Sequence, residues 1–155
     1  MKPSPEQMLR SLRVIIPSLA MGLLAFTGIG YAIAIGRELD ADLARIMLIV
    51  VATTAGGSVA TFFAVRQQML NRASEGSTDP ESRRERGSRA YFNITMIAAA
   101  LTEGVGLLAA VTAIVSGEWR VLAVSALSAI VILTMFPMQN SVEGFIERYT
   151  APAVR

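Results

Sequence analysis

The sequence has no cysteine and no histidine among its 155 residues. Without cysteine the chain has no disulfide framework, no thiolate metal site, no nucleophilic thiol and no site for palmitoylation or prenylation. Without histidine it lacks the most common ligand of zinc and haem and the usual general base near neutral pH. No paired acids or other catalytic constellation is visible among the remaining residues. We therefore expect a protein without enzymatic activity, without a metal site and without a cofactor.

Charge is also scarce, and it is unevenly distributed. Asp, Glu, Lys and Arg make up 17% of the chain and hydrophobic residues 53%, whereas about a quarter of the residues in a soluble domain are charged. The net charge of only +2 gives no basis for binding nucleic acid. The scarcity of charge predicts that the main partner of the chain is the lipid bilayer.

Long apolar runs dominate what is present. They cover 14–36, 46–65, 90–117 and 121–142. The first would measure about 34 Å as a helix, against a hydrocarbon core of roughly 30 Å. The sequence thus predicts an all-α fold, an integral membrane four-helix bundle that forms a single membrane domain over 1–155.

The positive charges predict how these spans are oriented. The two short connections hold only Arg37, Arg45 and Arg120 of the 14 Lys and Arg residues, and the other eleven lie near the termini and in 66–89. Because cytoplasmic segments are enriched in Lys and Arg, we expect a cytoplasmic loop at 66–89, short extracytoplasmic turns and both termini in the cytoplasm. The location expected is the cell (inner) membrane, as a multi-pass protein.

Local signals mark the start of two helices. Ser4-Pro5-Glu6-Gln7 is typical of a helix start in which Ser4 is the N-cap and Gln7 reaches back. Thr78 or Asp79 would cap a third helix that begins near Pro80. A cleaved signal peptide is the alternative for the N-terminus, because Ala32-Ile33-Ala34 resembles a cleavage site.

The C-terminal segment 139–155 follows Pro137, which is expected to end or kink the fourth helix. Apolar residues then recur at helical spacing: Val142, Phe145, Ile146 and Tyr149. The pattern indicates either a short amphipathic helix on the membrane surface or a continuation of the fourth helix into water.

Small residues recur along two of the spans, where they would let helix backbones approach closely in lipid. The predicted packing residues are Ala52, Gly56, Ala60 and Ala64 in the second span and Ala99, Gly106 and Ala110 in the third. They indicate either packing within one bundle or self-association between copies of the chain.

Glu103 is the only Asp, Glu, Lys or Arg residue within the four runs. It lies about 20 Å along the helix from Ala90, near the middle of the membrane, where an ionised carboxylate is costly. One interpretation is a proton or cation site formed with Thr102, Ser58 and Thr61. The others are a neutral acid hydrogen-bonded between helices and a carboxylate paired with a positive charge from a partner subunit.

The helix around Glu103, from Met96 to Leu108, remotely resembles the carboxylate helix of the proteolipid c subunit of rotary ATP synthases. Arg66-Gln67-Gln68 stands where that family has a polar-loop Arg-Gln-Pro, and the Gly- and Ala-rich second span stands where the family has its glycine-rich helix. The resemblance covers roughly 46–115 and implies proton or cation handling by Glu103. The chain departs from that family in its longer loop and in its two additional spans.

The whole chain also resembles a group of small uncharacterised bacterial four-span membrane proteins that carry Ala-Leu-x-Glu-Gly in the third helix. That resemblance implies an architecture and no activity. We expect a non-enzymatic accessory or structural subunit of a membrane assembly, as a homo-oligomer or with other membrane subunits. The alternative is a c-subunit-like protein that handles protons or cations through Glu103.

Overall fold

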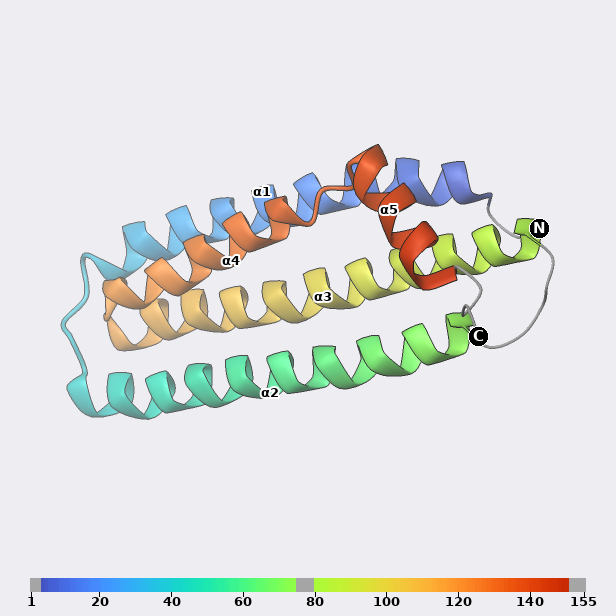
Figure 1. The fold of residues 1–155 in the computed structure, drawn as a ribbon. Helices are drawn as coiled ribbons and strands as arrows, with labels where there is room; N and C mark the ends of the chain where they lie inside the picture. Colours follow the sequence, from blue (N-terminus) through green and yellow to red (C-terminus); the bar gives the residue numbers. More distant parts are fainter. Residues whose placement is uncertain (1–3, 75–79, 151–155) are drawn as a thin grey trace.

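The structure, a computed structural model, describes residues 4–74 and 80–150, and the described chain is helical throughout apart from short connections (Figure 1). The elements in order are α1 (Pro5–Ala34), α2 (Ala41–Ser74), α3 (Pro80–Ser116), the 3₁₀ turn η1 (Trp119–Val121), α4 (Leu122–Thr134) and α5 (Gln139–Thr150). The all-α prediction is therefore confirmed.

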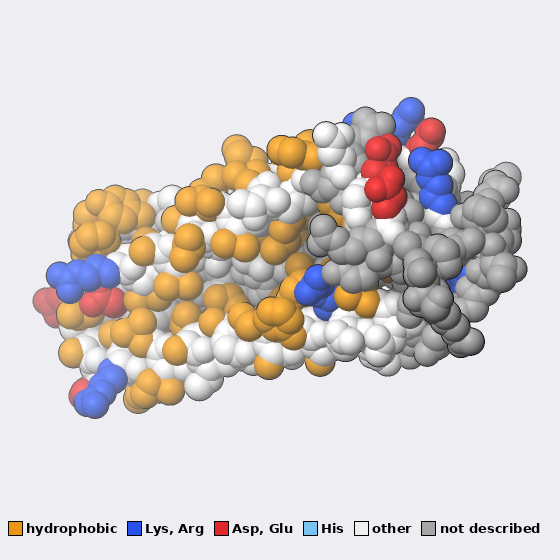
Figure 2. Space-filling model, in the orientation of Figure 1, with side chains coloured by type: hydrophobic (Ala, Val, Ile, Leu, Met, Phe, Trp, Pro, Cys, Tyr) orange, Lys and Arg blue, Asp and Glu red, His pale blue; other side chains and the backbone are white. Residues whose placement is uncertain are grey.

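Three of these helices, α1, α2 and α3, are long and apolar enough to cross a membrane. The fourth apolar helix, Trp119–Thr134, is shorter, at about 24 Å of helix axis. Figure 2 shows hydrophobic side chains over the middle of the molecule and charged side chains at both ends. The surface therefore has the distribution of a membrane protein.

The two ends differ in charge. One end, which we call the arginine-rich end, holds the start of α1 and α3 and the last turns of α2 (Figure 1). The Arg residues at this end whose side chains the structure describes are Arg10, Arg13, Arg66, Arg84, Arg86 and Arg89. The other end, which we call the turn end, holds the α1–α2 and α3–α4 connections with Arg37, Arg45 and Arg120.

The helix starts follow the sequence signals where the structure describes them. Gln7 N–H donates to Ser4 Oγ at 3.3 Å and Ser4 N–H donates to Gln7 Oε1 at 2.9 Å, so the predicted capping box is confirmed. In the same way, Leu43 N–H donates to Asp40 Oδ1 at 3.0 Å at the start of α2. Helix α3 begins at Pro80 as predicted; the predicted caps Thr78 and Asp79 lie outside the described residues.

The predicted loop 66–89 is largely helical, which corrects the sequence-based expectation. Helix α2 continues to Ser74, and α3 begins at Pro80. The residues after Arg66 are Gln67-Gln68-Met69-Leu70, which are good helix formers. An uncharged run therefore locates the apolar part of a helix but not its end.

The fourth predicted span, 121–142, is not one helix. Helix α4 ends at Thr134, and α5 begins as a separate helix at Gln139. Pro137 lies between them and is buried; a proline disfavours helical geometry at the residue before it. Of the two interpretations of the C-terminal segment, the described part is therefore a separate helix rather than a continuation of α4.

The core is formed by α1, α3 and α4, which pack against one another. Its largest cluster joins Leu12, Ile16, Ala20 and Leu23 of α1 to Ala99 of α3 and to Ala129 and Ile132 of α4. Helix α2 packs chiefly on α3 and, at the arginine-rich end, on α5. The molecule is a three-helix unit with α2 attached to one side, rather than a bundle with four equivalent helices.

A set of contacts that we call the clasp joins the two connections at the turn end. Asp40 N–H donates to the Ser116 carbonyl at 3.0 Å, and Arg37 Nη1 donates to the Ile114 carbonyl at 2.8 Å. Gly117 has a φ of 75°, and a Cβ atom there would lie 2.8 Å from the Glu38 carbonyl oxygen. The clasp thus requires a glycine at this position and fixes the start of α2 against the end of α3.

Candidate functional site

The predicted packing residues of α3 lie where this helix meets α1 and α4. Ala99 and Ala110 have no exposed surface. A Cβ atom at Gly106 would lie 2.6 Å from Leu23 Cδ2 and 2.9 Å from Ser128 Cβ. A Gly at this position therefore lets α3 approach α1 and α4 closely.

The predicted packing residues of α2 lie on the opposite side from its contact with α3. Ala52, Gly56, Ala60 and Ala64 are all exposed, and a Cβ atom at Gly56 would meet nothing within 4 Å. Instead, Val51 is buried in a cluster with Ala109 of α3, so a different face of α2 meets this helix. This corrects the interpretation that the small residues of α2 pack within the bundle.

Glu103 lies near the middle of α3 and is partly exposed. The structure gives it no hydrogen bond or ion pair with any residue in 4–74 or 80–150. The residues one turn before and after it, Ala99 and Gly106, are buried against α1 and α4. The carboxyl therefore lies at the edge of the α3 packing face, without a protein partner in the described chain.

The other three residues of the predicted ion site do not gather around Glu103. Thr102 and Ser58 line a groove to which Glu103 does not contribute, and Thr61 is exposed. The Thr102 hydroxyl donates to the Ala98 carbonyl at 2.8 Å, so its proton is used within its own helix. The structure thus brings two of the four residues together and leaves Glu103 and Thr61 apart from them.

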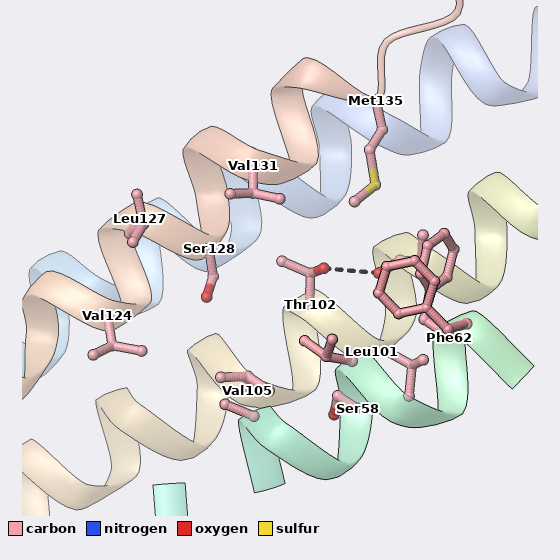
Figure 3. Close-up of a pocket in the computed structure, with 14 residues that line it drawn as sticks. Ser58, Phe62, Leu101, Thr102, Val105, Val124, Leu127, Ser128, Val131 and Met135 are labelled. Carbon is pink, nitrogen blue, oxygen red and sulfur yellow. Dashed lines mark hydrogen bonds between the residues drawn. The ribbon is translucent and has the colours of Figure 1, made fainter. Parts of the chain in front are cut away.

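The groove lies between α2, α3 and α4. Helix α3 forms its floor, and α2 and α4 form its two walls (Figure 3). Its volume is about 470 Å³, within the range of roughly 300–1,000 Å³ that ligand pockets occupy. Ser58, Thr102 and Ser128 each come from a different helix, and the lining is otherwise apolar.

Sequence reasoning missed this groove. The wall from α2 carries Ala55, Ser58, Val59 and Phe62, which repeat at i, i+3, i+4 and i+7. This spacing marks one face of a helix, and it was available in the sequence beside the small-residue pattern. The opposite wall, from α4, could not be predicted from the sequence. No local pattern shows that α2 and α4 both pack on α3 while a gap remains between them.

Within the described residues, no group of three or more Asp or Glu side chains is placed to hold a metal ion. The groups that could contact a ligand are therefore apolar side chains, the three hydroxyls of the groove and the carboxyl of Glu103. No protein-family model, curated protein or solved structure matches the chain.

Proposed function

We propose that this protein is a non-enzymatic structural subunit of a membrane assembly. Helix α2 makes the contact between subunits, and the simplest partner is a second copy of the chain. The protein is a multi-pass protein of the inner membrane, in which α4 with the connection to α5 makes a fourth passage. The arginine-rich end, with both termini, lies in the cytoplasm.

The observation that supports this proposal is the position of α2. Only 6% of its most apolar segment is buried, against 39% for α3. Its exposed face presents Ala52, Gly56, Ala60 and Ala64 over about 18 Å of helix axis. Small side chains give no particular advantage in contact with lipid, whereas they allow a second helix to approach closely and make van der Waals contacts.

Glu103 gives independent support to an assembly. A carboxylate near the middle of a bilayer is costly unless it is protonated or paired, and the described residues provide no partner. A hydroxyl, an amide or a cationic group of a neighbouring subunit would meet this need. The small-residue face of α2 and the Glu103 carboxyl thus both lack a contact partner within the described part of a single copy.

The orientation rests on the positive charges. The arginine-rich end carries six Arg residues whose side chains the structure describes and the turn end three, and segments that stay in the cytoplasm are enriched in Lys and Arg. Helix α5 begins near this end, where it packs on α3 and α2. Tyr91 and Phe145 meet edge to face there, with ring centroids 5.4 Å apart.

The native mass of the protein in mild detergent and in lipid nanodiscs tests the proposal. Wild type should form oligomers, and Gly56→Leu should weaken them at least tenfold without loss of helix content. Gly28→Leu is a matched control, because Gly28 is also an exposed helix glycine with nothing within 4 Å of an added Cβ atom. A monomeric wild type, or equal effects of the two substitutions, would contradict a contact through α2.

Cation or proton handling through Glu103 is the second candidate, favoured by the unpaired state of this carboxyl among the described residues. Under this alternative, dicyclohexylcarbodiimide should modify Glu103, and Na⁺ or high pH should suppress the reaction. Proton flux into liposomes should then be lost in Glu103→Gln while the native mass is unchanged. If Glu103→Gln leaves flux at the wild-type level, this alternative is excluded.

A further inference from the structure

The groove between α2 and α4 has the length of one leaflet of a bilayer. On α2 its lining extends from Ala55 to Phe63, about 12 Å of helix axis. On α4 it extends from Val124 to Met135, about 17 Å. Half of a hydrocarbon core of roughly 30 Å is about 15 Å, so the groove matches the depth of a single leaflet.

The groove continues toward the arginine-rich end. The uncharged segment of α2 is 46–65, and its centre lies between Ala55 and Gly56. Ala55 is the first groove residue on this helix and Phe63 the last. On α2 the groove therefore extends from the middle of the apolar segment toward the arginine-rich end, whereas on α3 and α4 it also reaches Val105 and Val124, nearer the turn end.

The lining suits a hydrocarbon chain. Val59, Phe62, Phe63, Leu101 and Val131 belong to its surface, and its hydroxyls leave almost no polar area exposed to the hollow. Figure 3 shows the apolar side chains of α2, α3 and α4 turned toward the same space. A flexible acyl chain can fill such an elongated apolar space.

A cationic side chain follows the groove at the end where a lipid headgroup would lie. Arg66 comes three, four and seven residues after Phe63, Phe62 and Val59, so it continues the same helix face. It is partly exposed. A guanidinium group at this depth is suited to a phosphate group, to which it can donate two hydrogen bonds.

From these four features we infer that the groove binds one acyl chain of an anionic phospholipid from the leaflet at the arginine-rich end, with the lipid phosphate beside Arg66. The occupant is thus defined by the length of the groove, by the end of the molecule toward which it continues on α2, by its apolar lining and by the charge beyond Phe63. This inference concerns the side of α2 that carries Ala55, Ser58 and Phe62, which adjoins the contact between subunits at Val59 and Phe63. Lipid retention tests it and subunit number tests the contact, so the two can be distinguished.

Native mass spectrometry of the delipidated protein, titrated with dioleoyl phosphatidylglycerol or dioleoyl phosphatidylcholine, tests the inference. Wild type should retain one phosphatidylglycerol per chain and prefer it about fivefold, as expected for one basic residue near an anionic surface. Ala55→Phe fills the groove and should lower retention at least tenfold. Ala123→Phe is the control, because Ala123 is exposed on α4 outside the groove.

Arg66→Gln should remove the preference for phosphatidylglycerol, and Arg66→Lys should keep most of it. Arg45→Gln, at the opposite end of α2, should leave it unchanged. Circular dichroism identifies any variant that has lost helix. Equal retention of the two lipids by wild type, or wild-type retention by Ala55→Phe, would overturn the inference. A change in subunit number in Ala55→Phe with retention unchanged would also overturn it, since the groove would then hold a second copy.

Discussion

Helices α2 and α3 are equally apolar and yet occupy different environments. Their most apolar segments have the same mean hydropathy, 1.9, but 6% of that segment is buried in α2 and 39% in α3. Hydropathy therefore makes both helices candidates for crossing a membrane and does not determine which of them faces protein. In this chain the difference comes from which face carries the small residues and whether another helix covers it.

The contrast between the two helices is sharpest at their glycines. Gly106 of α3 is enclosed by Leu23 and Ser128, whereas Gly56 and Gly57 of α2 have open space around them. The same residue type thus serves close packing in one helix and leaves an open surface in the other. Substitutions at such positions measure how far this distinction holds.

The largest effect is expected for Gly106→Leu. Because a Cβ atom would already lie 2.9 Å from Ser128 Cβ, the larger side chain must separate α3 from α4. We expect a loss of about 3 kcal/mol in the free energy of unfolding, the upper part of the range for overpacking. Thermal or denaturant unfolding in detergent measures it. At Gly104, on the same helix, an added Cβ atom would meet nothing within 4 Å, so Gly104→Leu should change the free energy of unfolding little. Equal losses of unfolding free energy in the two variants would contradict the difference between the two positions.

Gly117→Ala should have the next largest effect. A φ of 75° costs an L-residue roughly 1–2 kcal/mol, and the added Cβ atom would lie 2.8 Å from the Glu38 carbonyl oxygen. We expect about 2 kcal/mol of destabilisation and faster hydrogen exchange at the Asp40 amide, which donates to Ser116. In Gly36→Ala the nearest atom is 4.0 Å away. If Gly36→Ala is destabilised as much as Gly117→Ala, disruption of the clasp does not explain the loss of stability in Gly117→Ala.

A smaller effect is expected for the hydroxyl pair between α1 and α4. Thr27 Oγ1 donates to the Leu23 carbonyl at 2.7 Å, so Ser125 Oγ, also at 2.7 Å, donates to Thr27. Such bonds between membrane helices contribute about 0.6 kcal/mol on average. A double-mutant cycle with Thr27→Val and Ser125→Ala should give a coupling energy of this size. A coupling of zero would show that the pair does not hold α1 to α4.

The smallest effect is expected on the outer face of α2. Ala52→Leu changes an exposed residue, and exposed substitutions usually alter stability by less than about 0.5 kcal/mol. The unfolding free energy, measured at a dilution at which the protein is monomeric, should therefore equal that of wild type. A loss comparable to that of Gly106→Leu would mean that this face of α2 is covered within a single chain.

Much of the secondary structure could be predicted from single residues and their spacing. Ser4 and Gln7 form the predicted capping box, and α3 begins at Pro80. Both follow from local chemistry, in which a side chain satisfies nearby backbone groups or a proline fixes its own φ. The extension of α2 to Ser74 was missed, because polar helix formers after a membrane span look the same in a loop.

The candidate site was harder to predict, because it depends on which helix faces which. The periodic small residues of α2 identify one face of the helix. The pattern does not show whether that face packs against another helix of the same chain or lies on the outside. Ser58 and Thr102 both line the groove, whereas Glu103, only one residue from Thr102, is not among its lining residues. A rotation of about 100° per residue separates the two side chains, and choosing between them requires the position of α1 and α4.

Helix α2 is held near both of its ends, by the clasp at the turn end and by its packing against α5 at the arginine-rich end. Between these points the space beside α4 opens sideways. A molecule that occupies this space therefore arrives by diffusion in the plane of the membrane and leaves by the same route. Its exchange rate would then follow the fluidity of the surrounding lipid, not the concentration of any solute in water.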